Sequence, residues 1–247
     1  MSVPMKKRTR TRIICTLGPA SSHAQILERM IREGMSVARL NFSHGSHDEH
    51  RQRIRTIRRL NRDYGFSTVL LGDLEGYRVR IGSLKGGRPV VLEKGSVVHL
   101  VKDGHTGRSR ELPVDWPGRL DCIPVGQRVY IDDGKILLVV TRSTRESLEA
   151  RVEIPGAVRE HKGINMPGLV PPFTGLTEKD RRDVGFCLEE GIDWIAQSFV
   201  SRKSEMTALR RFIQRCGGDA VLVAKIENRQ GIRRIDGILA ASDGVMV

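Results

Sequence analysis

A short stretch of this 247-residue chain places a cation, an amide, a hydroxyl and an imidazole directly after an apolar run. These polar residues are Arg39, Asn41, Ser43 and His44. A guanidinium group binds phosphates and carboxylates, and amide and hydroxyl oxygens can coordinate a cation. Buried parallel strands are mostly apolar, and α/β folds bind ligands where such strands end. The stretch therefore predicts a site for an anion at the carboxyl end of a strand.

Lys225 and Glu227 form a second candidate pair near the end of another apolar run. Alternation along a strand places both side chains on one face. A carboxylate together with substrate oxygens commonly holds Mg²⁺, and a nearby lysine can stabilise a transferring phosphoryl group. A surface ion pair is the alternative interpretation.

Asp73 follows a third predicted strand and is itself followed by Arg78 and Arg80. A carboxylate at this position suits a barrel site, and the arginines could meet phosphates. A solvated turn is the alternative. Neither a P-loop nor a Gly-x-Gly-x-x-Gly turn is present in the sequence, so neither of these modes of nucleotide binding is supported.

Three histidines, His44, His47 and His50, are spaced by three residues. On a helix, this spacing could bring two imidazoles to one metal ion. No cysteine completes the set, and the segment begins a polar helix, so we prefer the interpretation without a metal.

The elements that must position these residues alternate between strands and amphipathic helices, which predicts a parallel sheet with helical crossovers. The expected strands are 12–17, 35–42, 68–71, 194–200, 220–226 and 244–247. Between them, residues 81–159 contain short β-rich runs, and Asp132-Asp133-Gly134-Lys135 predicts a hairpin. We expect a small all-β domain inserted in the α/β layer.

Composition is that of a globular protein, with 39% hydrophobic residues and a formal net charge of +13. The charge suits an anionic ligand, whereas the absence of aromatics among the arginines argues against nucleic acid. Four scattered cysteines favour a reducing compartment. With neither a signal peptide nor an apolar stretch of about 20 residues, we expect a cytoplasmic protein outside the membrane.

Several segments together resemble the pyruvate kinase family, in matching order along nearly the whole chain. They are the 37–45 stretch, Cys15-Thr16-Leu17-Gly18-Pro19-Ala20, Gly163-Ile164-Asn165-Met166-Pro167-Gly168, Leu176-Thr177-Glu178-Lys179-Asp180, Gln197-Ser198-Phe199-Val200 and Lys225-Ile226-Glu227-Asn228. The resemblance implies a TIM (β/α)8-type barrel, incomplete at the C-terminus, with an inserted small all-β barrel domain. Residues 1–80 and 160–247 would form the barrel, and 81–159 the inserted domain.

The resemblance also implies phosphoryl transfer from phosphoenolpyruvate to ADP, giving pyruvate and ATP in glycolysis. By motif, Arg39 and Lys225 would be catalytic and bind the substrate, and Glu227 would bind Mg²⁺ or Mn²⁺. The residues expected at the nucleotide are Asn41, His44, Arg80 and Lys162. The residues expected at a monovalent cation are Asn41, Ser43 and Asp73.

One departure from the family concerns K⁺. The third-strand motif commonly reads D-T-K-G-P-E-I-R, whereas here it reads D-L-E-G-Y-R-V-R. Leu74 removes a hydroxyl ligand, and Arg78 puts a fixed cation where a glutamate usually lies. This resembles a K⁺-independent subclass, so we expect K⁺ not to be required.

A second departure is length. The family continues beyond the position of Val247 with a second Mg²⁺ ligand and a catalytic threonine. We therefore expect a truncated chain with about five and a half of the eight barrel strands. A second polypeptide or self-association could complete the barrel. The alternative is a catalytically inactive pyruvate kinase-like pseudoenzyme that acts as a binding or regulatory partner.

Overall fold

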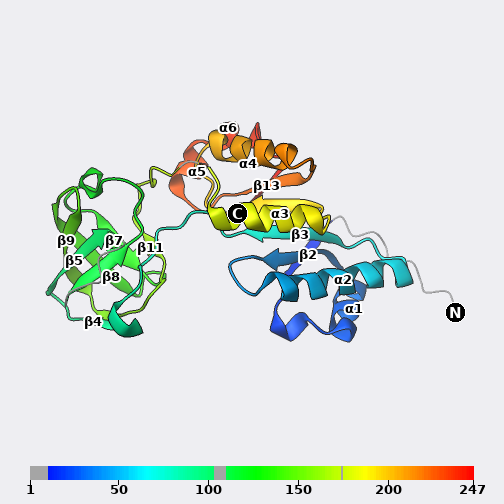
Figure 1. Cartoon of the computed structure of the whole chain (residues 1–247), viewed down its shortest axis with the longest axis horizontal. Coiled ribbons are helices and arrows are strands. Elements are labelled where there is room, and N and C mark those ends of the chain that lie inside the picture. The colour runs from blue at the N-terminus through cyan, green and yellow to red at the C-terminus, as the bar shows by residue number, and fades with distance from the viewer. Residues whose placement is uncertain (1–10, 103–109, 174) are drawn as a thin grey trace. The chain divides into compact units, whose positions relative to one another are not determined.

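The computed structural model describes residues 11–102, 110–173 and 175–247 of the chain. Contacts divide the chain into two compact units. The first consists of Met1–Gly76 and Gly175–Val247, and the second of Tyr77–Thr174. Each unit has its own hydrophobic core and is labelled by its elements in Figure 1.

The first unit contains a parallel sheet whose described strands follow the order β1-β2-β3-β12-β13-β14. Their bounds are β1 (Ile13–Thr16), β2 (Met35–Asn41), β3 (Val69–Leu74), β12 (Trp194–Gln197), β13 (Val221–Lys225) and β14 (Gly244–Met246). Strands that follow one another in this unit are neighbours in the sheet, as in a (β/α) barrel. Among the described strands, β1 and β14 each pair with one neighbour, so this barrel sheet is incomplete.

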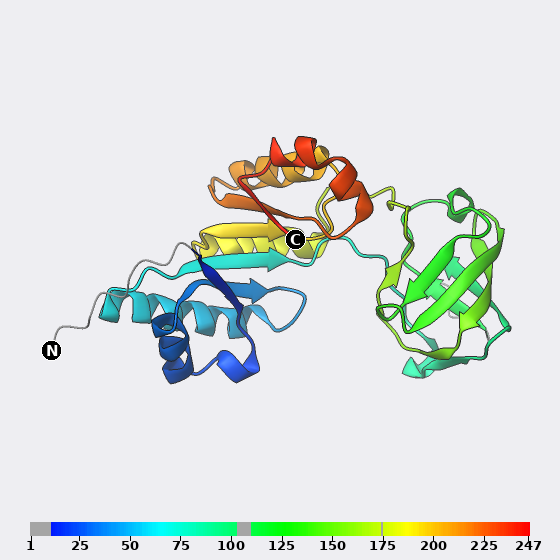
Figure 2. The same ribbon diagram turned by 180° about the vertical axis from the view of Figure 1, so that it is seen from behind.

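Helices cover one face of the sheet. Their bounds are α1 (Ala24–Arg32), α2 (His47–Tyr64), α3 (Glu178–Glu189), α4 (Lys203–Arg215), α5 (Arg229–Arg233) and α6 (Ile235–Leu239). Helix α3 lies in front of the sheet in Figure 1 and behind it in Figure 2. The main core forms between the helices and this face, and includes Leu40, Ile54, Ile57, Leu70, Val184, Ile195, Leu209 and Leu222.

The opposite face of the sheet carries a smaller apolar cluster of Val37, Leu71, Ala196 and Val223. Because side chains alternate along a strand, the residues two positions further along lie on the same face. Arg39, Asp73 and Lys225 occupy those positions on β2, β3 and β13. The sequence thus changes from apolar to charged along this face as the strands reach their carboxyl ends.

Two expected strands differ from the structure by more than one residue at an end. The third extends to Leu74 instead of ending at 71, because it pairs with β2 and β12 along that length. Asp73 therefore lies within a buried strand, and its side chain is 1% exposed. The fourth ends at Gln197 instead of 200, and Phe199 adopts a positive φ of 57°.

The described part of the second unit contains two β-sheets. One sheet has the order β11-β7-β8-β9-β5-β6 and the other β10-β4. The bounds are β4 (Val90–Leu92), β5 (Val97–Lys102), β6 (Glu111–Val114), β7 (Arg128–Ile131), β8 (Ile136–Ser143), β9 (Ser147–Ile154), β10 (Gly156–Val158) and β11 (Ile164–Asn165). Strands β7 and β8 are antiparallel, and Asp132 and Asp133 have positive φ between them. The predicted hairpin is confirmed.

The second unit is longer at both ends than the expected 81–159 segment. Val79, Ile164 and Met166 are buried in its core, and Arg80 bridges to Gly163. The chain therefore enters and leaves this unit along two paired segments. Across residues 11–102, 110–173 and 175–247, no helix is both long and apolar enough to cross a membrane.

Candidate active site

The charged end of the inner sheet face is organised around the carboxylate of Asp73. Two nitrogens of Arg39 donate hydrogen bonds to Asp73 Oδ2, Nε at 2.8 Å and also Nη2. Lys225 Nζ lies 3.1 Å from Oδ1 and 3.2 Å from Oδ2. The carboxylate is almost fully buried, whereas the side chains of Arg39 and Lys225 are 25% and 12% exposed. Two cations are thus held side by side at the rim.

Two hydroxyl groups complete this arrangement. Lys225 Nζ donates to Ser198 Oγ at 2.8 Å, and Ser198 donates to the Leu74 carbonyl at 2.7 Å. Arg39 Nη1 donates to Thr16 Oγ1 at 2.9 Å. We call Arg39, Asp73, Ser198 and Lys225 the Asp73 cluster. Ser198 and Thr16 occur in the motifs that the sequence singled out, but their contacts with these cations were not predicted.

Glu227 lies next to the Asp73 cluster. Its Oε1 is 3.5 Å from Lys225 Nζ, and its Oε2 accepts a hydrogen bond from the Phe199 backbone N–H at 3.0 Å. The positive φ of Phe199 directs that N–H toward the carboxylate. The side chain remains 32% exposed, which leaves lone pairs for a ligand.

The structure gives a partial fit for a divalent cation at Glu227. Hard cations such as Mg²⁺ prefer oxygen ligands and often use one or two carboxylates with substrate oxygens. Within the described residues, no group of three His, Cys, Asp or Glu side chains is placed to hold a metal. Glu227 can therefore supply one ligand, and the substrate and water must supply the others.

The loop after β2 carries Asn41, Ser43 and His44. Asn41 Oδ1 accepts the Ser43 N–H at 3.0 Å, which forms a tight polar turn. The His44 carbonyl lies 3.0 Å from Nε2 of His50, which is buried in α2. Burial is the main cause that lowers the pKa of His50, and its Nε2–H is the group that can donate to this carbonyl.

A second charged network supports the same loop. Lys179 Nζ donates to the Phe42 carbonyl at 2.5 Å and to Asp183 at 2.7 Å. The other oxygen of Asp183 is 2.7 Å from His47 Nε2, and the His47 ring stacks on Phe186. The spacing of the three histidines made His47 a candidate metal ligand. Its contacts here are an ion-pairing carboxylate and an aromatic ring.

The remaining candidate residues belong to the second unit. Arg80 and Lys162 lie on paired segments, since the Ile81 N–H donates to the Lys162 carbonyl at 2.9 Å. Arg80 Nη1 donates to the His161 carbonyl at 3.1 Å, and Lys162 Nζ is 2.9 Å from Asp132. Hydrogen bonds from Lys162 and Lys135 lower the pKa of Asp132.

Arg78 also lies in the second unit. Its Nη2 donates to Asp133 Oδ1 at 2.8 Å. Leu74, the other residue of the K⁺ departure, is buried in the core between sheet and helices. Neither residue offers an oxygen ligand from its side chain.

A parallel sheet with helices on one face and a charged rim at the strand ends defines a (β/α)-barrel protein. The family model "Pyruvate kinase, barrel domain" matches residues 8–247. The chain belongs to this family.

Curated relatives agree with this assignment. The human "Pyruvate kinase PKLR" is 40% identical over 257 residues, covering 100% of this chain and 45% of that protein. Proteins named "Pyruvate kinase" from Staphylococcus epidermidis and Geobacillus stearothermophilus are each 37% identical and cover 96% and 97% of this chain. The chain spans less than half the length of these relatives.

Proposed function

We propose that the chain provides the phosphoenolpyruvate site of a cytoplasmic pyruvate kinase, which transfers the phosphoryl group to ADP and yields pyruvate and ATP. The observation that supports this most strongly is the Asp73 cluster, where Arg39 and Lys225 converge on one carboxylate. Family membership supports the same reaction.

Arg39 has the donors needed to hold the phosphate. A guanidinium carries five N–H donors, and three nitrogens already donate to Asp73 and Thr16. One donor remains on each terminal nitrogen, which suits a bidentate contact with phosphate oxygens. Asp73 and Thr16 hold the guanidinium group of Arg39 in this orientation.

Lys225 would stabilise the negative charge of the transferring group and of the enolate. Two of its three protons are directed to Asp73 and Ser198, which leaves one for the substrate. Because the ammonium is already fixed, little reorganisation is needed when charge develops.

Glu227 would hold Mg²⁺ or Mn²⁺ together with substrate oxygens. A bound divalent cation would supply positive charge that offsets the charge of the phosphoryl oxygens. The contact from the Phe199 N–H orients this carboxylate.

Arg80 and Lys162 would contact the nucleotide phosphates, with Asn41 and His44 near the nucleotide. Asn41, Ser43 and Asp73 would be the oxygen ligands of a monovalent cation. We propose that this cation is dispensable, because Leu74 lacks a hydroxyl and Arg78 supplies a fixed positive charge.

A pseudoenzyme is the second candidate, favoured because no group of three His, Cys, Asp or Glu side chains among the described residues is placed to hold a metal. The sheet edges at β1 and β14 favour a second polypeptide or self-association as a further partner.

A lactate-dehydrogenase-coupled assay with phosphoenolpyruvate, ADP and Mg²⁺ separates the enzyme from the pseudoenzyme. The enzyme predicts turnover that Lys225→Met abolishes and Lys203→Met, an exposed substitution on α4, leaves unchanged. Binding of phosphoenolpyruvate without turnover would favour the pseudoenzyme.

A further inference from the structure

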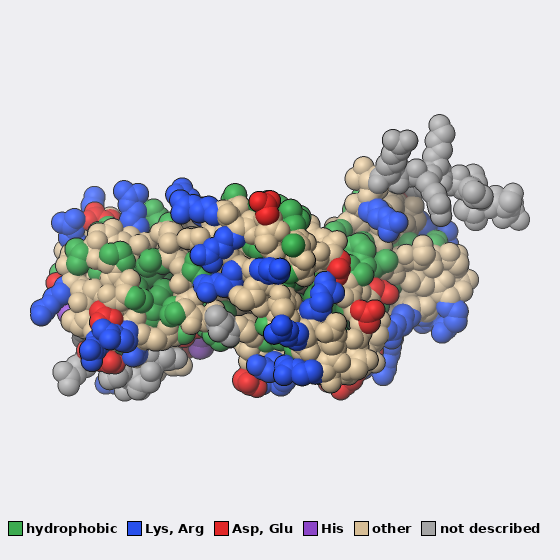
Figure 3. All heavy atoms as spheres, turned by 90° about the horizontal axis from the view of Figure 1, so that it is seen from above, with side chains coloured by type: hydrophobic (Ala, Val, Ile, Leu, Met, Phe, Trp, Pro, Cys, Tyr) green, Lys and Arg blue, Asp and Glu red, His purple; other side chains and the backbone are tan. Residues whose placement is uncertain are grey.

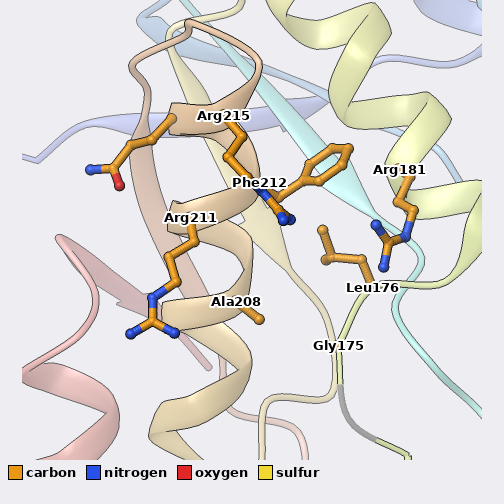
Figure 4. Close-up of a pocket in the computed structure, with 8 residues that line it drawn as sticks. Gly175, Leu176, Arg181, Ala208, Arg211, Phe212 and Arg215 are labelled. Atoms are coloured by element: carbon orange, nitrogen blue, oxygen red, sulfur yellow. The ribbon is translucent and has the colours of Figure 1, made fainter.

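A cavity of about 530 Å³ lies between α3 and α4 in the first unit, and Figure 4 shows its lining. It is lined by Gly175, Leu176, Arg181, Ala208, Arg211, Phe212, Gln214 and Arg215. Its volume is within the range that accommodates small organic ligands. It shares no residue with the Asp73 cluster, and its helices cover the sheet face opposite to the rim.

Two of the arginines lie against the same aromatic ring. The Cζ atoms of Arg181, on α3, and Arg215, on α4, are 5.4 Å and 5.9 Å from the Phe212 ring centroid. Figure 4 shows their guanidinium groups on either side of the Leu176 side chain. The cavity therefore combines an apolar surface with positive charge at its margins.

The positive charge of the cavity is largely uncompensated. Within the described part of the chain, the Arg211 and Arg215 side chains form no ion pair or hydrogen bond. Arg181 has a carboxylate partner, Glu178, at 3.8 Å. That glutamate is 85% exposed, and such surface pairs are weak. None of the eight lining residues is acidic.

Other basic residues increase this potential. Figure 3 shows Lys and Arg side chains spread over the face that carries α4 and α6. Three guanidinium groups around one cavity repel each other, and an anion between them removes that repulsion. Arginine forks match phosphate oxygens in geometry.

We propose that this cavity binds an organic phosphate whose non-phosphate part is flat and apolar. Phosphate oxygens would pair with the arginines at the margin, and the flat group would pack on Leu176, Ala208 and Phe212. This site is separate from the phosphoenolpyruvate site and does not depend on the proposed reaction.

Calorimetric titration of the full chain with 1-naphthyl phosphate, inorganic phosphate and 1-naphthol tests the proposal. We expect 1-naphthyl phosphate to bind at least tenfold more tightly than either of the other two probes. Arg211→Gln/Arg215→Gln should weaken its binding at least tenfold. Both positions are exposed and unpaired, so the variant should keep its fold, which circular dichroism checks.

Two control variants locate the site. Arg182→Gln, an exposed change on α3 outside the cavity lining, should leave binding unchanged, and so should Lys225→Met at the rim. The proposal is overturned if 1-naphthyl phosphate does not bind, or if the double variant binds it as the unmodified chain does. Equal weakening by Lys225→Met would also overturn it, because the compound would then occupy the rim.

Discussion

The ammonium nitrogen of Lys225 lies 3.1 Å from the carboxylate of Asp73, although 152 residues separate them in the sequence. The sheet order explains this contact, because β12 pairs with both β3 and β13. The inserted second unit accounts for much of the separation along the chain. The pair holds the Lys225 ammonium at the rim, where an incoming anion would meet it.

Asp73→Asn should lower the free energy of unfolding by about 3 kcal/mol, because it leaves two cations next to a buried, uncharged amide. Urea denaturation followed by circular dichroism measures the change. Asp63→Asn, which alters an exposed residue at the end of α2, should change stability by less than about 0.5 kcal/mol. Equal midpoints for the two variants would contradict the importance of the Asp73 charge.

Lys179→Met should loosen the loop after β2. It removes the hydrogen bond to the Phe42 carbonyl and one cation from Asp183, whose side chain is only 4% exposed. We expect faster amide hydrogen exchange over residues 43–46, measured by mass spectrometry, while exchange in β13 stays the same. Unchanged exchange in the loop would show that Lys179 does not hold it.

Acid should destabilise the first unit through His50. Its pKa is lowered by burial, so below about pH 6.5 the unfolded chain binds a proton that the folded chain excludes. The free energy of unfolding should therefore fall from pH 7 to pH 5, by up to about 1.4 kcal/mol per pH unit from this group. His50→Gln should flatten this dependence, whereas His99→Gln should not. Parallel curves for all three proteins would rule out His50 as the cause.

Potassium should have little effect on turnover if the chain is active. Replacing tetramethylammonium chloride by KCl at constant ionic strength should change the rate less than twofold. The resemblance to the K⁺-independent subclass implies this, since Leu74 lacks a hydroxyl and Arg78 replaces the usual glutamate. Arg78→Glu should introduce a dependence on K⁺. A many-fold activation of the unmodified protein by KCl would be inconsistent with this view.

Much of the fold could be predicted from local patterns. Apolar runs followed by helical periodicity predict a parallel sheet, and the strand ends then predict where Arg39 and Lys225 lie. The start of α3 is local in the same way, since the Thr177 hydroxyl caps the helix by accepting the Asp180 N–H at 2.9 Å. These features depend on neighbouring residues or on a general rule for α/β folds.

Contacts between distant segments could not be predicted in this way. The sequence placed Asp73 after the third strand, with a solvated turn as the alternative, whereas that strand continues to Leu74 and the Asp73 carboxylate contacts Arg39 and Lys225. Which charges meet depends on the register between strands, and no local pattern encodes it. The contact of Lys179 with the Phe42 carbonyl, 137 residues away, was missed for the same reason.

We propose that the Asp73 cluster binds the phosphate of phosphoenolpyruvate. Calorimetric titration with phosphoenolpyruvate and Mg²⁺ tests it most directly, in the unmodified chain, Arg39→Gln and the exposed control Arg55→Gln. Loss of a charge-assisted bidentate contact should raise the Kd at least tenfold in Arg39→Gln and leave it unchanged in Arg55→Gln. The same Kd in all three proteins would contradict the claim.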